Sequence, residues 1–124
     1  MFELAVEHTI SAGHQLRGYE GKCEHCHGHN WRIRLEVAAE AVDALGLVLD
    51  FGVLKRLLED VLDPYDHVML NELPDFRDVN PSSEHLARLV FRRCRERLAH
   101  GHPEARVIAV TVWESPRARV RYHE

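Results

Sequence analysis

The sequence contains few cysteines, no large excess of either charge and no long apolar run. Its three cysteines are an odd number for 124 residues, which argues against a disulfide scaffold and favours a reducing compartment. The formal net charge of −4 argues against a general nucleic-acid-binding protein, because such proteins present a basic surface. No apolar run approaches the roughly 18 residues that a membrane-spanning helix needs. We therefore expect neither a nucleic-acid partner nor a membrane partner.

The sequence also lacks the pattern of a secretory signal. The first residues, Met-Phe-Glu-Leu, have neither the basic start nor the apolar core of a signal peptide, so we expect a cytoplasmic protein. A length of 124 residues suffices for one hydrophobic core but not for two, which predicts a single domain over residues 1–124.

Histidine, by contrast, is abundant, and three of the ten histidines lie with two cysteines in residues 23–30. This segment, Cys-Glu-His-Cys-His-Gly-His-Asn, runs directly into an alternating apolar and polar stretch, residues 31–37. His27 and His29 are two residues apart, so in an extended strand both point to the same face as the apolar residues that follow. Buried imidazoles need partners, and two side by side indicate a metal site.

The third candidate ligand is His14, which follows a first alternating stretch at the start of the chain. Three histidines without an obvious fourth protein ligand are typical of a catalytic zinc site that keeps one position open. Copper and nickel also bind imidazole, so the residues alone do not identify the metal. The competing interpretation is a structural zinc site with Cys23 and Cys26 as ligands, but Cys26 directly adjoins His27, which is an unfavourable spacing.

Cys23 is the candidate reactive group of the segment. It lies four residues before His27, close enough to approach a molecule bound to the metal without being a ligand itself. Nearby positive charge, from Lys22 or the metal, would favour its thiolate form. The alternative is an inert structural cysteine.

Three further residues are candidates for proton transfer or ligand binding. Asp66 could hold His67 in the tautomer that proton transfer needs, although such a pair in a loop is usually solvated. Glu114 shares a strand face with Val112, so its carboxylate lies either at the wet end of the strand or against a ligand with two parallel N–H groups.

Periodicity predicts the order strand-strand-helix-helix-strand-strand. The strands are expected over residues 1–10, 29–39, 107–114 and 117–122. Residues 11–28 are expected to form a loop that carries His14. One helix should follow an Asp50 N-cap and end before Pro64, and another should begin within residues 81–84. This order predicts an α+β domain, with a four-stranded antiparallel sheet and two helices on one face.

Several motifs together resemble the 6-pyruvoyltetrahydropterin synthase and 6-carboxytetrahydropterin synthase family over nearly the whole chain. The matching stretches are Ser-Ala-Gly-His (11–14), Cys-x-x-x-His-Gly-His-Asn (23–30), Asp-Phe (50–51), Tyr-Asp-His-x-x-Leu-Asn (65–71), Asn-Pro-Ser-Ser-Glu (80–84) and Trp-Glu-Ser (113–115). Their combined order and spacing are highly specific, although no single motif is. Gly13 departs from the alanine of many members, and Cys26 is an additional thiol.

The resemblance implies roles for the candidate residues. It implies that zinc (Zn²⁺) is bound by His14, His27 and His29. It implies that Cys23 is the catalytic proton acceptor, that His67 and Asp66 belong to the proton relay, and that Glu114 anchors the pterin and belongs to the catalytic machinery. The implied architecture is the tunnelling fold, in which sheets of several subunits join into a barrel with active sites between subunits. We therefore expect a homo-oligomer built on trimers, with a hexamer as the specific prediction.

The implied activity is that of a zinc-dependent lyase acting on 7,8-dihydroneopterin triphosphate. The short chain is more similar to the bacterial 6-carboxytetrahydropterin synthases of 7-deazaguanine and queuosine biosynthesis, which release triphosphate and acetaldehyde. Alternatives with the same site are a 6-pyruvoyltetrahydropterin synthase and a folate-pathway pterin lyase. An alternative from another class is a non-enzymatic structural zinc-binding module. Lys22, Arg17 and a basic residue of another subunit are candidates for binding the triphosphate, and nothing in the sequence selects among them.

Overall fold

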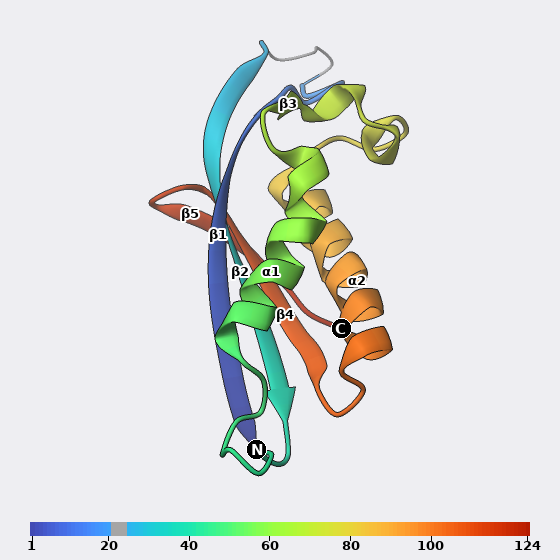
Figure 1. Cartoon of the computed structure of the whole chain (residues 1–124). Coiled ribbons are helices and arrows are strands. Elements are labelled where there is room, and N and C mark those ends of the chain that lie inside the picture. The colour runs from blue at the N-terminus through green and yellow to red at the C-terminus, as the bar shows by residue number, and fades with distance from the viewer. Residues whose placement is uncertain (21–24) are drawn as a thin grey trace.

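A long two-stranded hairpin forms the centre of the computed structural model, which describes residues 1–20 and 25–124 (Figure 1). Its strands, β1 (Phe2–His14) and β2 (His27–Ala39), pair antiparallel over their full lengths. The expected loop over residues 11–28 is therefore too long, because β1 continues to His14 and β2 begins at His27. Small residues obscured these strand ends in the sequence, whereas the pairing across the hairpin extends through them.

The sheet has five strands in the order β3-β1-β2-β4-β5, rather than the expected four. β4 (Arg106–Ser115) pairs antiparallel with β2, and β5 (Ala118–Tyr122) pairs antiparallel with β4. Both pairings agree with the predicted antiparallel sheet. The additional strand, β3 (Val68–Met69), pairs parallel with β1 at the far edge. A strand of two residues has no periodicity, so sequence patterns could not reveal it.

Two capped helices lie side by side on the same face of the sheet (Figure 1). α1 (Phe51–Leu62) begins after Asp50, whose side chain accepts a hydrogen bond from the Gly52 N–H at 2.6 Å. α2 (Ser83–Gly101) begins after Ser82, whose hydroxyl accepts from the His85 N–H at 3.2 Å. Both caps satisfy donors that the first helical turn leaves unpaired, which explains where the helices begin.

The core lies between the helices and the sheet face that they cover, here called the inner face; the opposite face is called the outer face. Alternate residues of β2 point inward and have no exposed surface: Trp31, Ile33, Leu35 and Val37. Each such side chain contributes about 1.5–3 kcal/mol through its burial. This apolar layer holds β1 and β2 rigidly, including the ends of the strands that carry the histidines.

The segment between the helices was expected to be a long loop over residues 64–80, and it contains three single-turn 3₁₀ helices. These are η1 (Asp63–Tyr65), η2 (Leu70–Glu72) and η3 (Pro74–Phe76). Tyr65 packs edge-on against Phe76, and its hydroxyl donates to Asp75 at 2.8 Å. Among the residues that the structure describes, no helix combines the length and the apolar character needed to cross a membrane.

Candidate metal centre

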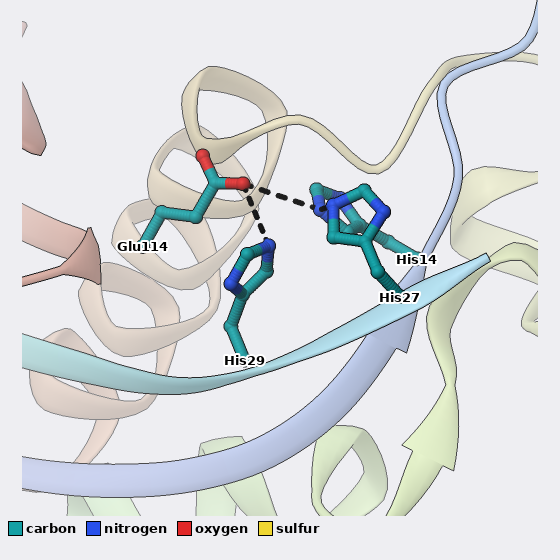
Figure 2. Close-up of side chains that lie close together, drawn as sticks. All are labelled: His14, His27, His29 and Glu114. Carbon is teal, nitrogen blue, oxygen red and sulfur yellow. Dashed lines mark hydrogen bonds and ion pairs between the residues drawn. The ribbon is translucent and has the colours of Figure 1, made fainter. Parts of the chain in front are cut away.

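Three histidines and one glutamate converge on the inner face, at the end of the hairpin where the chain passes from β1 to β2 (Figure 2). His14 is the last residue of β1 and pairs with His27, the first residue of β2. His29 follows two residues later on the same face, and Glu114 comes from the end of β4. The ligand atoms of all four lie within 4.8 Å of one another. The predicted convergence of the histidines is therefore present, and Glu114 joins it.

The cluster continues the alternation that builds the core. Trp31, fully buried, packs edge-on against His14 and His29, with ring centroids 4.8 and 5.3 Å apart. Its indole N–H donates to the Ala12 carbonyl at 3.1 Å, which ties β2 to β1 directly below the histidines. Trp31 therefore forms an apolar base that fixes where the imidazoles lie.

The distances between donor atoms suit a small divalent cation. His14 Nε2 lies 2.9 Å from His27 Nε2 and 3.3 Å from Glu114 Oε1, and His29 Nε2 lies 2.8 Å from the same oxygen. Ligands held tetrahedrally at about 2.0–2.1 Å from zinc would be separated by about 3.4 Å. Apart from this ion-pair contact with Glu114, the buried His29 Nε2 has no hydrogen-bond partner within the described part of the chain. The set of donors thus fits a metal ion of the size of zinc.

Backbone carbonyls set the tautomers of two of these histidines. His14 Nδ1 lies 2.7 Å from the Pro81 carbonyl oxygen, and His27 Nδ1 lies 2.9 Å from that of His25. A carbonyl can only accept a hydrogen bond, so each Nδ1 carries the proton and each Nε2 directs a lone pair into the cluster. This is the arrangement that metal-ligating histidines require.

The environment of His29 favours the neutral ligand form of its imidazole. Burial lowers the pKa of His29 below its usual value, and this is the largest effect. The Glu114 carboxylate acts in the opposite direction, whereas His14 and His27 lower the pKa further. A neutral imidazole is the form that binds a metal.

The cluster borders an open cavity of about 290 Å³ rather than a sealed interior. Ser83, at the start of α2, lines this cavity, and its hydroxyl lies 3.4 Å from Glu114 Oε2. Arg119 of β5 lines it as well. A small molecule could therefore reach the metal position, as a catalytic site requires and a closed structural site does not.

Two asparagines hold the chain that follows His14, and sequence reasoning missed them. Asn71 accepts from the Gln15 N–H at 2.9 Å and donates to the Gln15 carbonyl at 2.8 Å. Asn80 forms the same reciprocal pair with Arg17, at 2.8 and 2.9 Å. Each amide side chain thus replaces the backbone of a missing neighbouring strand. Asn71 is the last residue of the motif over residues 65–71, and Asn80 is the first residue of the motif over residues 80–84. Their place in these motifs was the sequence signal that could have identified them.

The guanidinium of Arg17 is bound to the protein's own backbone. It donates to the carbonyl of Val79 at 2.8 Å, to that of Arg77 at 3.3 Å and also to that of Phe76. These contacts hold the segment before α2 against the end of β1. They leave Arg17 poorly suited to bind a triphosphate, and Lys22, the other candidate named in this chain, lies outside the described residues.

Asp66 and His67 lie together but apart from the metal cluster. His67 Nε2 is 3.7 Å from Asp66 Oδ2, and Asp66 Oδ1 accepts from the Ser11 N–H at 2.8 Å. The His67 side chain is 81% exposed and lines an open depression with Ser11 and Asn30, whose parity along β1 and β2 puts them on the outer face. Within one chain, the predicted proton relay is therefore not among the clustered donors, and it lies on the outer side of the strand ends, where His29 also borders the depression.

The Cys-x-x-x-His-Gly-His-Asn motif contains two thiols, those of Cys23 and Cys26. Cys23, the predicted proton acceptor, lies outside the described residues. Cys26 is exposed, and its Sγ lies 3.0 Å from Gln15 Oε1. It is not one of the donors of the described cluster, which gives no support to the alternative in which cysteines hold a structural zinc.

Comparisons with known proteins agree with the motifs. Residues 3–124 match the family model described as 6-pyruvoyl tetrahydropterin synthase. A 6-carboxy-5,6,7,8-tetrahydropterin synthase from a Synechocystis species is 35% identical over 101 residues, covering 77% of each chain. The enzyme of that name from Bacillus subtilis is 31% identical over 120 residues, which cover 93% of this chain and 80% of the relative.

A solved structure has the same arrangement of strands and helices. The 6-pyruvoyl tetrahydropterin synthase of Caenorhabditis elegans superposes with a TM-score of 0.86 at 25% identity, covering 99% of this chain and 95% of that chain. This similarity confirms the expected α+β tunnelling fold with two helices on one face. Within residues 1–20 and 25–124, the addition to the expected sheet is the fifth strand, β3.

Proposed function

Because the chain belongs to the 6-pyruvoyl tetrahydropterin synthase family, we propose that it is a zinc-dependent pterin lyase. The proposed reaction converts 7,8-dihydroneopterin triphosphate to 6-carboxy-5,6,7,8-tetrahydropterin, with release of triphosphate and acetaldehyde, in 7-deazaguanine and queuosine biosynthesis. The observation that carries the proposal is the convergence of His14, His27 and His29 beside an open cavity. The names of the Synechocystis and Bacillus subtilis relatives favour the 6-carboxy product.

The three histidines have the properties that the proposed zinc site needs. When bound there, zinc supplies Lewis acidity that stabilises negative charge developing on a substrate oxygen. His14 and His27 direct Nε2 lone pairs inward because backbone carbonyls hold their Nδ1 protons. The fixed tautomers reduce the reorganisation that metal binding would otherwise require.

Further residues have proposed roles in binding and proton transfer. Glu114, at the cavity wall, can accept the two parallel N–H groups of an aminopyrimidinone ring. Cys23 is proposed to accept the substrate proton, and Asp66 with His67 to perform the complementary transfer. The outer-face position of His67 supports a homo-oligomer in which this pair serves the site of a neighbouring subunit. The proposed assembly is built on trimers.

A second candidate product is 6-pyruvoyltetrahydropterin, favoured by the similarity to the Caenorhabditis elegans enzyme of that name. Both reactions would use the same cluster and cavity. The products differ in mass, so one assay distinguishes them.

The decisive experiment incubates the zinc-loaded protein with dihydroneopterin triphosphate and identifies the products by mass spectrometry. We expect 6-carboxytetrahydropterin, together with triphosphate and acetaldehyde. A 6-pyruvoyl product would select the second candidate, and no turnover by the zinc-loaded oligomer would overturn the proposal. Cys23→Ala should retain zinc and lose at least about 10²-fold in rate, as expected for a proton-transfer group. Cys26→Ala is the matched control and should remain active.

A further inference from the structure

Glu114 lies where a fourth metal ligand would lie. Its Oε1 is 2.8 Å from His29 Nε2 and 3.3 Å from His14 Nε2, and all four candidate ligand atoms fall within 4.8 Å of one another. Figure 2 shows its carboxylate directed at the imidazoles from the opposite side of the cluster. In the sequence, no fourth ligand was obvious beside the three histidines. Glu114 lies on β4, which is far from β1 and β2 along the chain although it pairs with β2 in the sheet.

We propose that Glu114 is a fourth protein ligand that completes the coordination of the metal while the cavity is empty of substrate. This inference rests on the metal site of the proposed function. It assigns Glu114 a role in addition to binding the pterin, and it makes the resting site a His₃Glu site rather than a three-histidine site with an open position.

The orientation of the imidazoles supports a cation between them and the carboxylate. His14 and His27 carry their protons on Nδ1, so their Nε2 atoms present lone pairs to the centre of the cluster. The Glu114 Oε1 presents a further lone pair 3.3 Å from His14 Nε2. Lone pairs at these separations repel one another, whereas a divalent cation among them attracts all of them.

The surroundings of Glu114 suit a ligand that can be replaced. Its side chain is 36% exposed at the cavity, whereas that of His14 is only 3% exposed. Its other oxygen, Oε2, lies 3.4 Å from the Ser83 hydroxyl, which offers a partner for the carboxylate when it leaves the metal. The histidines therefore form the permanent part of the site, and Glu114 forms the exchangeable part.

Metal binding without any pterin tests the inference. Zinc affinity would be measured at fixed pH by competition with a chromophoric chelator, and coordination by the visible spectrum of the Co²⁺-substituted protein. Glu114→Gln should weaken zinc binding at least about tenfold, since even removing groups that only orient metal ligands costs 10–100-fold. It should also change the Co²⁺ spectrum. Glu114→Ala should do the same, with thermal melts to verify folding.

Glu84→Gln is the matched control, because Glu84 lines the same cavity and carries the same charge but is not among the four clustered donors. We expect its zinc affinity and Co²⁺ spectrum to match those of the wild type. Equal zinc affinities and identical spectra for Glu114→Gln and Glu84→Gln would overturn the inference and leave the proposed function intact. A wild-type protein that binds no zinc would overturn both.

Discussion

The inner and outer faces of β2 have opposite chemistry, although their residues alternate along one strand. On the inner face, Trp31 and Ile33 are fully buried in the core. On the outer face, Arg32 and Arg34 remain partly exposed and both pair with Glu7, at 3.5 and 2.8 Å. The inner face is held by the removal of apolar surface from water, whereas the outer face is held by ion pairs that water and salt weaken.

The outer face also contains a tryptophan, Trp113, which is covered by arginine side chains and not by the apolar core. Trp113 of β4 is 8% exposed because arginines lie over it, with the Arg32 guanidinium carbon 3.9 Å from the ring centroid. These side chains are long and partly solvated, so they can move without disturbing the backbone. Trp31, packed against His14 and His29 on the inner face, has no such freedom.

The comparison shows why the metal cluster lies on the inner face. A metal site needs ligands held within a few tenths of an ångström, and the packed core supplies that rigidity to the strand ends. His29 continues the row of inward residues directly from Trp31. Placed one residue further along, at the position of Asn30, the same imidazole would lie on the outer face beside Ser11, away from the other three donors.

The largest expected effect comes from breaking the inner face. Trp31→Ala should lower the free energy of unfolding by about 3–5 kcal/mol, because it leaves a cavity below the histidines. Chemical denaturation of the metal-free protein measures this loss. Arg32→Ala, one residue away on the outer face, is the control and should cost at most about 1 kcal/mol. Equal losses in the two variants would refute the distinction between the faces.

A smaller effect is expected from alkaline pH, which acts on Tyr65 of the hydrophobic core. Burial and the hydrogen bond to Asp75 raise the pKa of Tyr65 to about 12. The unfolded chain releases this proton near pH 10, so the stabilisation is complete below pH 10 and is lost as pH rises from about 10 to 12. Denaturation at several pH values should show that the free energy of unfolding declines over this range, and Tyr65→Phe should reduce the decline. An identical decline in the wild type and the variant would contradict the role of Tyr65.

The smallest effect is expected on the outer face itself. Arg34→Gln breaks the pair with Glu7 and should cost about 0.2–1 kcal/mol, since both partners are partly exposed. The difference from the wild type should shrink in high salt, because screening weakens the pair in the wild type. Melting curves of both proteins at low and high ionic strength measure this difference in stability. A larger loss that is independent of salt would show that Arg34 acts through packing instead.

Local patterns predicted much of the fold because the causes are local. The Asp50 cap and the turn around Pro64 set the ends of α1 through residues only a few positions apart. Strand ends were predicted less well, since Gly13 and Gly28 weaken the pattern and yet belong to paired strands. Pairing across the hairpin decided those positions.

The sequence by itself determined that His27 and His29 share a face, because alternation in a strand is a property of the strand alone. Only the tertiary structure decided that Glu114 meets them, that Asn80 holds Arg17, and that His67 lies on the outer face. These contacts join residues far apart in the chain and depend on strand register and loop path. Such long-range geometry results from the packing of the whole core, so no short stretch of residues encodes it.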